Sequence, residues 1–394
     1  MPQDKKIEGL LTRGVENIYP NREEVEKVLK AGKKLRLYHG IDPTAESLHL
    51  GHMVQMLKLR QFQDLGHEVI VLIGDFTAQI GDPSDKSATR KQLAHKEVLK
   101  NAKDYKKQIS RFLDLKKTKF LYNSKWLGKL DLKETLELAA HFSVQRLLER
   151  DMFQNRVKEG KIIHLHEFFY PVLQAYDSVA MDVDMETGGN DQTFNMLAGR
   201  TLMKTLKDKE KYVVTTKLLT DAQGVKMGKT TGNMARLNDT PEDMYGIILS
   251  WPDGFILPGF ELLTAISMEE IKKMKGEMQT GRNPKECKMI LAHRVVEMNF
   301  GTKEADRAQE EFKKVHEEKS APDDMKEVKI NSKNIMDVLV ETKLCTSKAD
   351  ARRNIDQGGI KIDGEVVKDL NYTIIKPCVI QKGKRFFVKV VISS

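Results

Sequence analysis

The chain has 394 residues, too many for one ordinary domain, and its 40% hydrophobic and 31% charged composition is typical of a soluble protein with a sizeable core. No apolar run approaches the roughly 20 residues of a membrane-spanning helix, and the N-terminus holds no apolar signal core, so we expect a cytoplasmic protein. The net charge is +9, and the segment from Lys329 onwards holds 13 Lys and Arg against 7 Asp and Glu, which permits a polyanionic partner there.

A strand–helix–strand unit lies near the start of the chain. The residue pattern predicts a strand over 35–41, and apolar residues at helical spacing predict a helix over 50–65 that stops at Gly66. A second strand is predicted over 68–73, and its mostly apolar character is typical of a parallel sheet covered on both faces. We interpret the three segments as a βαβ unit.

Strand and helix signals continue to alternate beyond this unit, after a loop rich in Gly, Asp and Pro at 74–84. We predict helices over 91–112, 131–150, 166–180 and 188–205, and strands over 181–185 and 212–219. This alternation favours an α/β fold with a doubly wound, Rossmann-like parallel sheet.

The pattern changes after residue 238. Helices are predicted over 241–249, 268–278, 284–300 and 302–315, followed by a linker at 320–324 and by β features at 359–363 and 385–392. We therefore expect an α/β domain over 1–238, an α-helical domain over 239–325 and a small α+β module over 326–394.

The first chemical motif follows the first strand. Asp42-Pro43-Thr44 and His49-x-x-His52 stand at a strand-to-helix junction, where parallel sheets bind ligands and a helix N-terminus attracts phosphate. His49 and His52 are three apart and would share one face of the first turn. Gly51 between them leaves the backbone open to an adenine ring, so the motif suits ATP.

Two other interpretations of the histidine pair stay open. The histidines could bind a metal, although no acidic or cysteine partner stands at zinc-protease spacing, or they could be structural. The three cysteines, Cys287, Cys345 and Cys378, are too few for a four-cysteine zinc site and are most simply buried residues or free thiols. The usual glycine-rich phosphate loop is absent from the sequence.

The second chemical motif is Lys226-Met227-Gly228-Lys229-Thr230, which follows the last strand of the α/β region. Two lysines on a glycine-rich loop can stabilise the charge that develops as pyrophosphate leaves. Taken alone, the segment is more simply interpreted as a solvated basic loop. The fold class, however, brings both motifs to one edge of the sheet.

Together the motifs resemble the paired signatures of class I aminoacyl-tRNA synthetases. His49-Leu50-Gly51-His52 is similar to the first signature, and Lys226–Thr230 is similar to the second, with Gly228 and Thr230 where Ser is commoner. The resemblance implies that ATP with Mg²⁺ is a co-substrate, that an amino acid is activated as its adenylate, and that tRNA receives it. No tightly bound, protein-ligated metal is expected.

Four further segments resemble the tyrosine branch of that family, in its bacterial form with a shortened anticodon region. They are Tyr38-x-Gly40-x-Asp42-Pro43-Thr44, Gly81-Asp82-Pro83-Ser84, Tyr170-x-x-x-Gln174-x-x-Asp177 and Gly188-Gly189-x-Asp191-Gln192. Tyr170, Gln174 and Asp177 would line one helix face, where a buried carboxylate needs a partner. A tyrosine hydroxyl could donate to Asp177 and accept from Tyr38; alternatively, Gln174 and Asp177 lie on a surface face.

The resemblance also implies the roles of the site residues. Tyrosine would contact Tyr38, Gly40, Thr77, Asp82, Tyr170, Gln174, Asp177 and Gln192, with its ammonium at Asp82, Tyr170 and Gln174. ATP would contact Asp42, His49, Gly51, His52, Lys86, Arg90, Gly189, Asp191, Lys226, Met227 and Lys229. Transition-state charge would be stabilised by Thr44, His49, His52, Lys226, Lys229 and Thr230. His39 and Glu186 receive no firm role.

The basic tail resembles a small RNA-binding module found in a ribosomal protein and in pseudouridine synthases, on the segments Thr346–Arg353 and Gln357–Gly364. Ser347 is a candidate N-cap, and Arg352, Arg353 and Lys361 are candidate tRNA contacts; a bare structural cap is the alternative. The family implies tRNA(Tyr), L-tyrosine and ATP as partners and a homodimer joined through helices in 131–149.

Three other functions are compatible with part of the sequence. A tryptophanyl-tRNA synthetase shares the fold and both signatures, but Tyr38, Asp177 and the basic tail disfavour it. An RNA-binding protein without catalysis is disfavoured by the intact His49, His52, Lys226 and Lys229. A nucleotidylyltransferase also uses His-x-x-His, but such enzymes are usually shorter and would not explain the tail.

Overall fold

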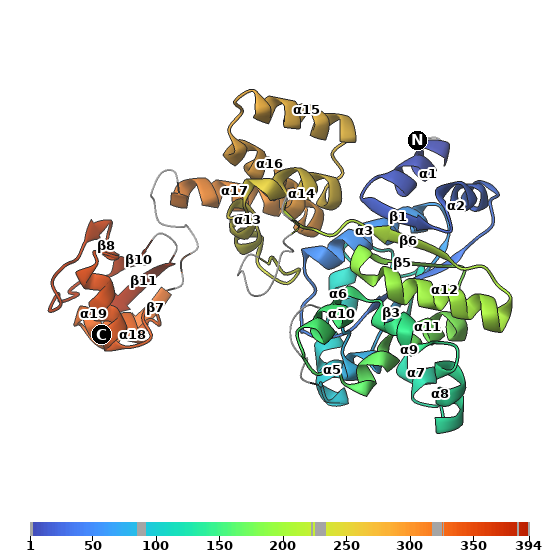
Figure 1. Cartoon of the computed structure of the whole chain (residues 1–394). Helices are drawn as coiled ribbons and strands as arrows, with labels where there is room; N and C mark the ends of the chain where they lie inside the picture. Colours follow the sequence, from blue (N-terminus) through green and yellow to red (C-terminus); the bar gives the residue numbers. More distant parts are fainter. Residues whose placement is uncertain are drawn as a thin grey trace. The chain divides into compact units, whose positions relative to one another are not determined.

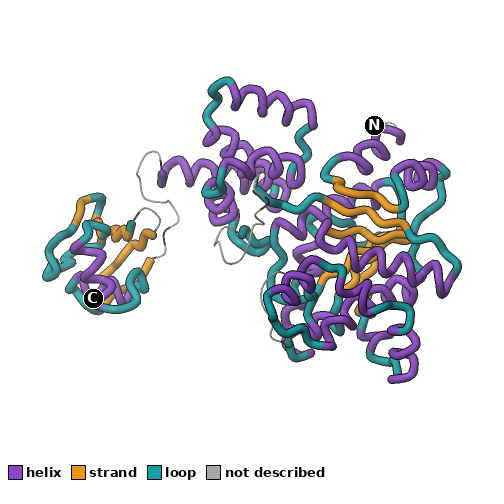
Figure 2. Tube along the Cα trace, viewed as in Figure 1, coloured by secondary structure: helices purple, strands orange, loops and turns teal. Residues whose placement is uncertain are grey.

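The computed structural model describes residues 3–84, 92–221, 224, 234–316, 325, 327–383 and 386–392. They form two compact units, Met1–Gly301 and Thr302–Ser394. Figure 1 labels their helices and strands, and Figure 2 separates helix, strand and loop by colour. Among the described residues, no helix is both long and apolar enough to cross a membrane.

A six-stranded sheet lies at the centre of the first unit (Figure 2). Its strands are β1 (Val15–Tyr19), β2 (Arg36–Ile41), β3 (Glu68–Ile73), β4 (Thr118–Tyr122), β5 (Met185–Gly189) and β6 (Tyr212–Thr216), in the spatial order β1-β6-β5-β2-β3-β4. All neighbours are parallel except β1, which pairs antiparallel with β6. The predicted doubly wound α/β fold is confirmed: from β2 the strand order runs outward through β3 to β4, and from β5 it runs outward the opposite way to β6. Such sheets bind ligands at the point between β2 and β5 where the strand order reverses.

Helices surround this sheet. They are α1 (Gln3–Thr12), α2 (Arg22–Lys30), α3 (Leu50–Asp64), α4 (Thr77–Ile80), α5 (His95–Ala102), α6 (Tyr105–Ile109), α7 (Ser124–Leu127), α8 (Leu132–Ala139), α9 (Val144–Leu148), α10 (Asp151–Lys158), α11 (Leu165–Met181), the 3₁₀ helix η1 (Asn190–Gln192) and α12 (Thr193–Lys207). α3 packs against β3 and β5, and α12 packs against β5, β6 and α11. A buried apolar cluster that includes Val172, Ala175 and Leu202 joins α11 to α12.

A helical segment completes the first unit. It comprises α13 (Pro241–Leu249), η3 (Asp253–Phe255), α14 (Ile256–Leu263), α15 (Met268–Gln279) and α16 (Pro284–Phe300). α14 packs against α3, and the Arg13 guanidinium donates to four backbone carbonyl groups at or just after the end of α14: those of Phe260, Glu261, Thr264 and Ile266. These contacts hold the helical segment to the α/β part within one compact unit.

The second unit contains α17 (Thr302–His316) and a small α+β module. The module comprises β7 (Glu327–Ile330), α18 (Ile335–Glu341), α19 (Lys348–Asp356), β8 (Ile360–Ile362), β9 (Glu365–Val366), β10 (Cys378–Lys382) and β11 (Phe386–Ile392). Its sheet has the order β7-β11-β10-β8-β9, and its own apolar core includes Ile335, Ile355 and Ile380. Ser347 caps α19 as predicted, because its side chain accepts from the Asp350 N–H.

Several element predictions need correction. The predicted strand at 181–185 is wrong: Met181 ends α11, Asp182 is left-handed with φ 49°, and β5 begins only at Met185. Gly188 and Gly189 belong to that strand and do not open a helix, since α12 begins at Thr193 after a 3₁₀ turn. The predicted helices at 91–112 and 131–150 are each broken into shorter helices. The predicted linker at 320–324 lies outside the described residues.

Candidate active site

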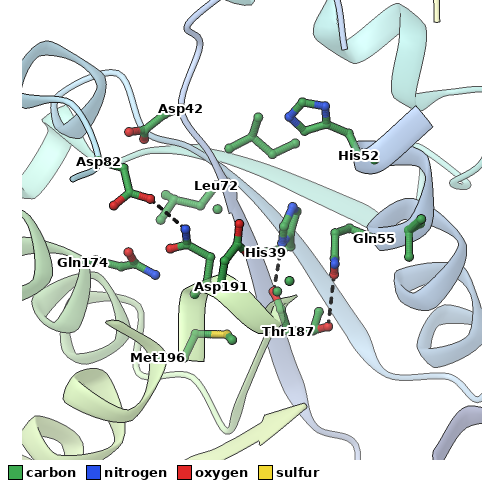
Figure 3. A pocket seen from close by; sticks show the side chains of 18 of the residues that line it. His39, Asp42, His52, Gln55, Leu72, Asp82, Gln174, Thr187, Asp191 and Met196 are labelled. Atoms are coloured by element: carbon green, nitrogen blue, oxygen red, sulfur yellow. Dashed lines mark hydrogen bonds between the residues drawn. The ribbon is translucent and has the colours of Figure 1, made fainter. Parts of the chain in front are cut away.

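A cavity of about 360 Å³ opens at the carboxyl ends of the parallel strands, where the strand order reverses between β2 and β5. It is lined by all the predicted tyrosine, ATP and catalytic residues that the structure describes: Tyr38, Gly40, Asp42, Thr44, His49, Gly51, His52, Thr77, Asp82, Tyr170, Gln174, Asp177, Gly189, Asp191 and Gln192. In Figure 3, Asp42, Asp82 and Gln174 lie along one side, and His52 and Gln55 along the other. Residues more than 150 positions apart in sequence thus share one cavity.

The predicted residues of the second motif, Lys226, Met227, Lys229 and Thr230, lie outside the described residues. The same holds for Lys86 and Arg90. The described residues on either side of the motif nevertheless border the cavity: Leu218 and Leu219 precede it and Met234 follows it. Downstream, the Leu50 N–H donates to the Ala235 carbonyl over 3.1 Å. The chain that flanks the second motif is therefore paired with the first motif.

The two histidines form the start of α3. The Gly51 N–H donates to His49 Nδ1 over 3.1 Å, and the His49 N–H donates to His52 Nδ1 over 3.2 Å, with ring centroids 3.9 Å apart. Because each Nδ1 accepts, each neutral ring carries its proton on Nε2 and is a hydrogen-bond donor there. This tautomer suits phosphate oxygens and disfavours the metal alternative. Within the described ranges, no cluster of three His, Cys, Asp or Glu side chains could hold a metal ion.

Gly51 has a second function beside the one expected from the sequence. A Cβ at this position would lie 2.9 Å from His49 Cε1 and 3.0 Å from its Nδ1. The glycine therefore allows the His49 ring to fold over the helix N-terminus and to cap it.

A hydrogen-bonded chain crosses the cavity wall from Asp42 to Asp177. Asp42 accepts from the Thr77 hydroxyl over 2.7 Å and from the Tyr170 hydroxyl over 2.9 Å. The Asn123 side-chain amide donates to Thr77 Oγ1 over 3.1 Å and to Asp177 Oδ2 over 3.2 Å. These hydrogen bonds link Asp42, which was predicted to bind ATP, to Asp177, which was predicted to bind tyrosine.

Asp177 is 2% exposed, so the alternative of a surface face is wrong for this residue. Trp126 Nε1 donates to its Oδ1 over 2.7 Å, in addition to the bond from Asn123. Burial raises the pKa of Asp177, and the two hydrogen bonds oppose that rise. The carboxyl group therefore has protein donors on both oxygens, and neither Asn123 nor Trp126 was predicted from the sequence.

Asp82 is held by two other side chains. Gln192 Nε2 donates to its Oδ2 over 2.7 Å (dashed in Figure 3), and the Arg150 guanidinium lies 3.9 Å from its Oδ1. Arg150 is buried and stacks near the rings of Phe153 and Phe194, at 5.6 and 5.1 Å. Arg150 is the last residue of the predicted helix at 131–150 and belongs to no motif, so the sequence analysis did not identify it.

The cavity floor contains a buried ion pair between Lys211 and Glu186. The Lys211 ammonium also donates to Ser178 Oγ over 2.8 Å, and that hydroxyl lies 3.0 Å from the Tyr38 hydroxyl. Burial lowers the pKa of Lys211, and Glu186 opposes that shift. His39, which also lines the cavity, is 8% exposed and hydrogen-bonds the Thr187 carbonyl through Nδ1 over 2.8 Å, and burial lowers its pKa, which favours the neutral ring.

The three candidate tRNA contacts lie in the second unit. Arg352 and Arg353 are exposed on α19, and Lys361 is partly exposed on β8. Arg353 donates to Asp350 over 2.9 Å, which places its guanidinium along the helix surface. Two large apolar side chains of the same module, Ile375 and Phe386, are 80% and 62% exposed and were not predicted as contacts.

Comparisons with known proteins agree with this geometry. Residues 30–317 match the sequence model of the class I tRNA synthetases for tryptophan and tyrosine, and residues 317–390 match the C-terminal domain of tyrosine–tRNA ligases. The tyrosine–tRNA ligase of Carboxydothermus hydrogenoformans is 44% identical and covers 99% of both chains. That of Thermotoga maritima is 42% identical over 97% of this chain and 96% of its own.

The chain belongs to the tyrosyl-tRNA synthetase family. The C-terminal match and the relatives named above support the tyrosine branch and not the tryptophan alternative. Among solved structures, a C-terminally truncated mitochondrial tyrosyl-tRNA synthetase of Coccidioides posadasii is 26% identical, with a TM-score of 0.61 over 78% of this chain and 94% of that one. A tyrosyl-tRNA synthetase of Archaeoglobus fulgidus, 22% identical with a TM-score of 0.62 over 78% of this chain and 100% of its own, shows the same fold.

Proposed function

We propose that this chain is a tyrosine–tRNA ligase, which activates L-tyrosine with ATP and transfers it to the terminal ribose of tRNA(Tyr). One observation carries the proposal: Tyr38 and the buried Asp177 line the same cavity as the His49–His52 helix start. A phenolic hydroxyl fits between a hydroxyl and a buried carboxyl group, and a phosphate fits against the histidines. The full-length similarity to tyrosine–tRNA ligases supports the same conclusion.

In the proposed first step, the tyrosine carboxylate attacks the α-phosphorus of ATP and pyrophosphate leaves. A carboxylate is already ionised at neutral pH, so the site needs no general base and acts by positioning and by stabilising charge. Asp82, Tyr170 and Gln174 would bind the ammonium, with Gln192 near the carboxylate. The Nε2 protons of His49 and His52, with Thr44, would point to the phosphates.

The remaining roles in this step follow from the family resemblance. Gly40 and Thr77 would border the tyrosine, and Asp42, Gly51, Gly189 and Asp191 would border the nucleotide. Lys86, Arg90, Lys226, Met227, Lys229 and Thr230 would contact the ATP phosphates or the departing pyrophosphate. Mg²⁺ would arrive bound to ATP and neutralise charge on its phosphates.

In the second step, a hydroxyl of the terminal tRNA ribose attacks the acyl group and releases AMP. We assign tRNA binding to the C-terminal module over 326–394, with Arg352, Arg353 and Lys361 as phosphate contacts, and an anticodon-region role to the helices of 239–325. Both steps would take place in the cytoplasm, where charged tRNA is consumed.

We also propose a homodimer joined through the α8–α11 region. Large apolar side chains are exposed there: Leu132, Leu136, Val144, Val157, Ile162 and Leu165, at 58–75% of their full area. Several large apolar side chains exposed within one stretch of the chain favour a surface that a partner covers. Light scattering of Leu132→Asp/Leu136→Asp should give a monomer where the native chain gives a dimer; a native monomer, or a dimeric variant, would contradict this interface.

The function is tested by ATP–pyrophosphate exchange with each of the twenty amino acids in turn. We expect exchange with tyrosine and little with phenylalanine, because phenylalanine leaves the Tyr38 and Asp177 polar groups unpaired. Exchange that depends on tryptophan, or on none of the twenty, would overturn the proposal.

A further inference from the structure

Lys211 is fully buried beneath the cavity and makes three contacts. Its Nζ donates to Ser178 Oγ over 2.8 Å, to the Met196 carbonyl over 3.1 Å and to Glu186 Oε2. The Met196 carbonyl and an ionised Glu186 can only accept, and Lys211 and Glu186 form an ion pair, so Lys211 is assigned as an ammonium that donates to all three groups. A buried ion pair is often no more stabilising than apolar side chains of the same volume, so its presence calls for another reason.

The surrounding fold leaves room for this ammonium. A Cβ at Gly199, in the middle of α12, would lie 2.5 Å from Lys211 Nζ and 2.8 Å from Ser178 Oγ. Glycine inside a helix is about 1 kcal/mol less favourable than alanine. The glycine therefore stands where the buried ammonium and its hydroxyl partner need the space.

The ion pair fixes the orientation of the Gln174 amide. An ionised Glu186 can only accept, so the group that faces its Oε1, at 3.1 Å, must be the Gln174 NH₂. The Gln174 Oε1 atom is then turned elsewhere; it is buried and has no hydrogen-bond partner among the described residues. Gln174 lines the cavity, so this oxygen is an acceptor suited to a substrate ammonium.

The same pair fixes the direction of the hydrogen bonds toward Tyr38. Ser178 Oγ accepts from Lys211, which leaves its single proton to donate to the Tyr38 hydroxyl oxygen, 3.0 Å away. The Tyr38 proton then has two acceptors within reach, the Glu186 carboxylate, which hydrogen-bonds the Tyr38 hydroxyl, and the oxygen of a bound ligand. On a substrate tyrosine, the phenolic oxygen would accept from Tyr38 while its own proton is donated to Asp177.

We propose that Lys211 and Glu186, acting through Ser178 and Gln174, are positioning residues that set the hydrogen-bond polarity of the amino-acid pocket. They make Tyr38 a donor to the substrate hydroxyl and Gln174 an acceptor for the substrate ammonium. The first effect concerns tyrosine alone, because phenylalanine has no hydroxyl group. The second concerns both amino acids equally. This inference rests on the proposed function of the cavity.

The first test is Ser178→Ala, which cuts the link to Tyr38 and leaves the ion pair in place. In ATP–pyrophosphate exchange, the KM for tyrosine should rise by roughly three- to tenfold, the value of one net hydrogen bond, while exchange with phenylalanine stays within about twofold of the native chain. A merely structural role would change both amino acids alike. Equal effects on the two substrates, or no effect on either, would overturn the proposal.

The second test is the double variant Lys211→Met/Glu186→Gln, which avoids leaving one buried charge without its partner. The amide introduced at position 186 can present either its oxygen or its NH₂ group to Gln174, so the Gln174 oxygen is no longer fixed toward the ammonium and KM should rise for both amino acids. Ser178 also loses its lysine donor, so the preference for tyrosine over phenylalanine should fall. The matched control is Lys209→Met/Asp184→Asn, an ion pair of 3.2 Å that lies two residues earlier in each segment and is more exposed. The control should leave both KM values unchanged.

Melting temperatures show whether a variant is still folded, so that a change in KM can be assigned to altered hydrogen-bond directions and not to unfolding. A double variant that melts like the native chain and keeps both KM values would overturn the proposal. If the double variant fails to fold, Ser178→Ala alone decides. Failure of the native chain to exchange with tyrosine would instead overturn the proposed function, so the two failures are distinguishable.

Discussion

Replacing Gly74 by alanine should disable the amino-acid and ATP site with little change elsewhere. The added Cβ would lie 1.9 Å from Asp42 Oδ1 and 2.4 Å from Thr77 Oγ1, whereas a tolerable contact needs at least 3.0 Å. The Asp42 carboxylate must therefore move by about 1.1 Å. That displacement breaks its bonds of 2.7 Å to Thr77 and 2.9 Å to Tyr170.

The expected loss follows from the two bonds. Each hydrogen bond to a charged group contributes about 1.5–3 kcal/mol, so even partial loss of both bonds removes about 3 kcal/mol of the free energy that holds the site in its native arrangement. If that geometry is needed in the transition state, kcat/KM for tyrosine-dependent exchange falls by roughly a hundredfold. Gly246→Ala is the control, because a Cβ there meets no atom within 4 Å. Exchange by Gly74→Ala within about twofold of the native rate, in a folded protein, would refute the reasoning.

Three further predictions concern other parts of the chain. Burial lowers the pKa of Lys58 to about 7. Between pH 7 and 10, Lys58 therefore binds a proton in the unfolded chain but not in the folded chain, and the free energy of unfolding rises with pH. Urea titrations at several pH values should show a smaller rise for Lys58→Met than for the native chain. Trp126→Phe removes a hydrogen bond that lowers the pKa of Asp177, so the acid limb of kcat/KM for tyrosine should move to higher pH, and an unmoved limb would contradict this role. A chain that ends at residue 316 should keep tyrosine-dependent exchange and lose most tRNA charging at ordinary salt. Full charging by this shortened chain would contradict a role of the C-terminal module in tRNA binding.

Much of the fold could be predicted because local patterns agreed with it. The βαβ unit at 35–73 combines apolar strands, a helical period and a glycine stop, and its predicted bounds match β2, α3 and β3 closely. The short outer strands β1 and β4 were missed, since five residues with mixed burial give little periodic signal. β5 was misplaced because Gly188 and Gly189 resemble a helix start, whereas they lie in the strand. An added Cβ would lie 3.1 Å from Met196 at Gly188 and 2.9 Å from Leu218 at Gly189, so both positions leave little space for a side chain.

The candidate site was predicted only as far as its motifs reach. Its described motif residues gather in one cavity, but their roles stay proposals. The residues that hold them in place come from segments without a motif: Asn123 after β4, Trp126 on α7, Arg150 before α10 and Lys211 before β6. Each of these residues contacts a site residue that is far away in sequence, and such a contact leaves no local pattern from which it could be predicted.

The most direct measurement is the charging of tRNA with labelled tyrosine by the purified full chain, in the presence of ATP and Mg²⁺. The account predicts tyrosine esterified to the terminal ribose of tRNA(Tyr), with one AMP released for each tyrosine transferred. Charging with tryptophan on its own tRNA, or no charging of tRNA(Tyr) by a folded protein, would contradict it.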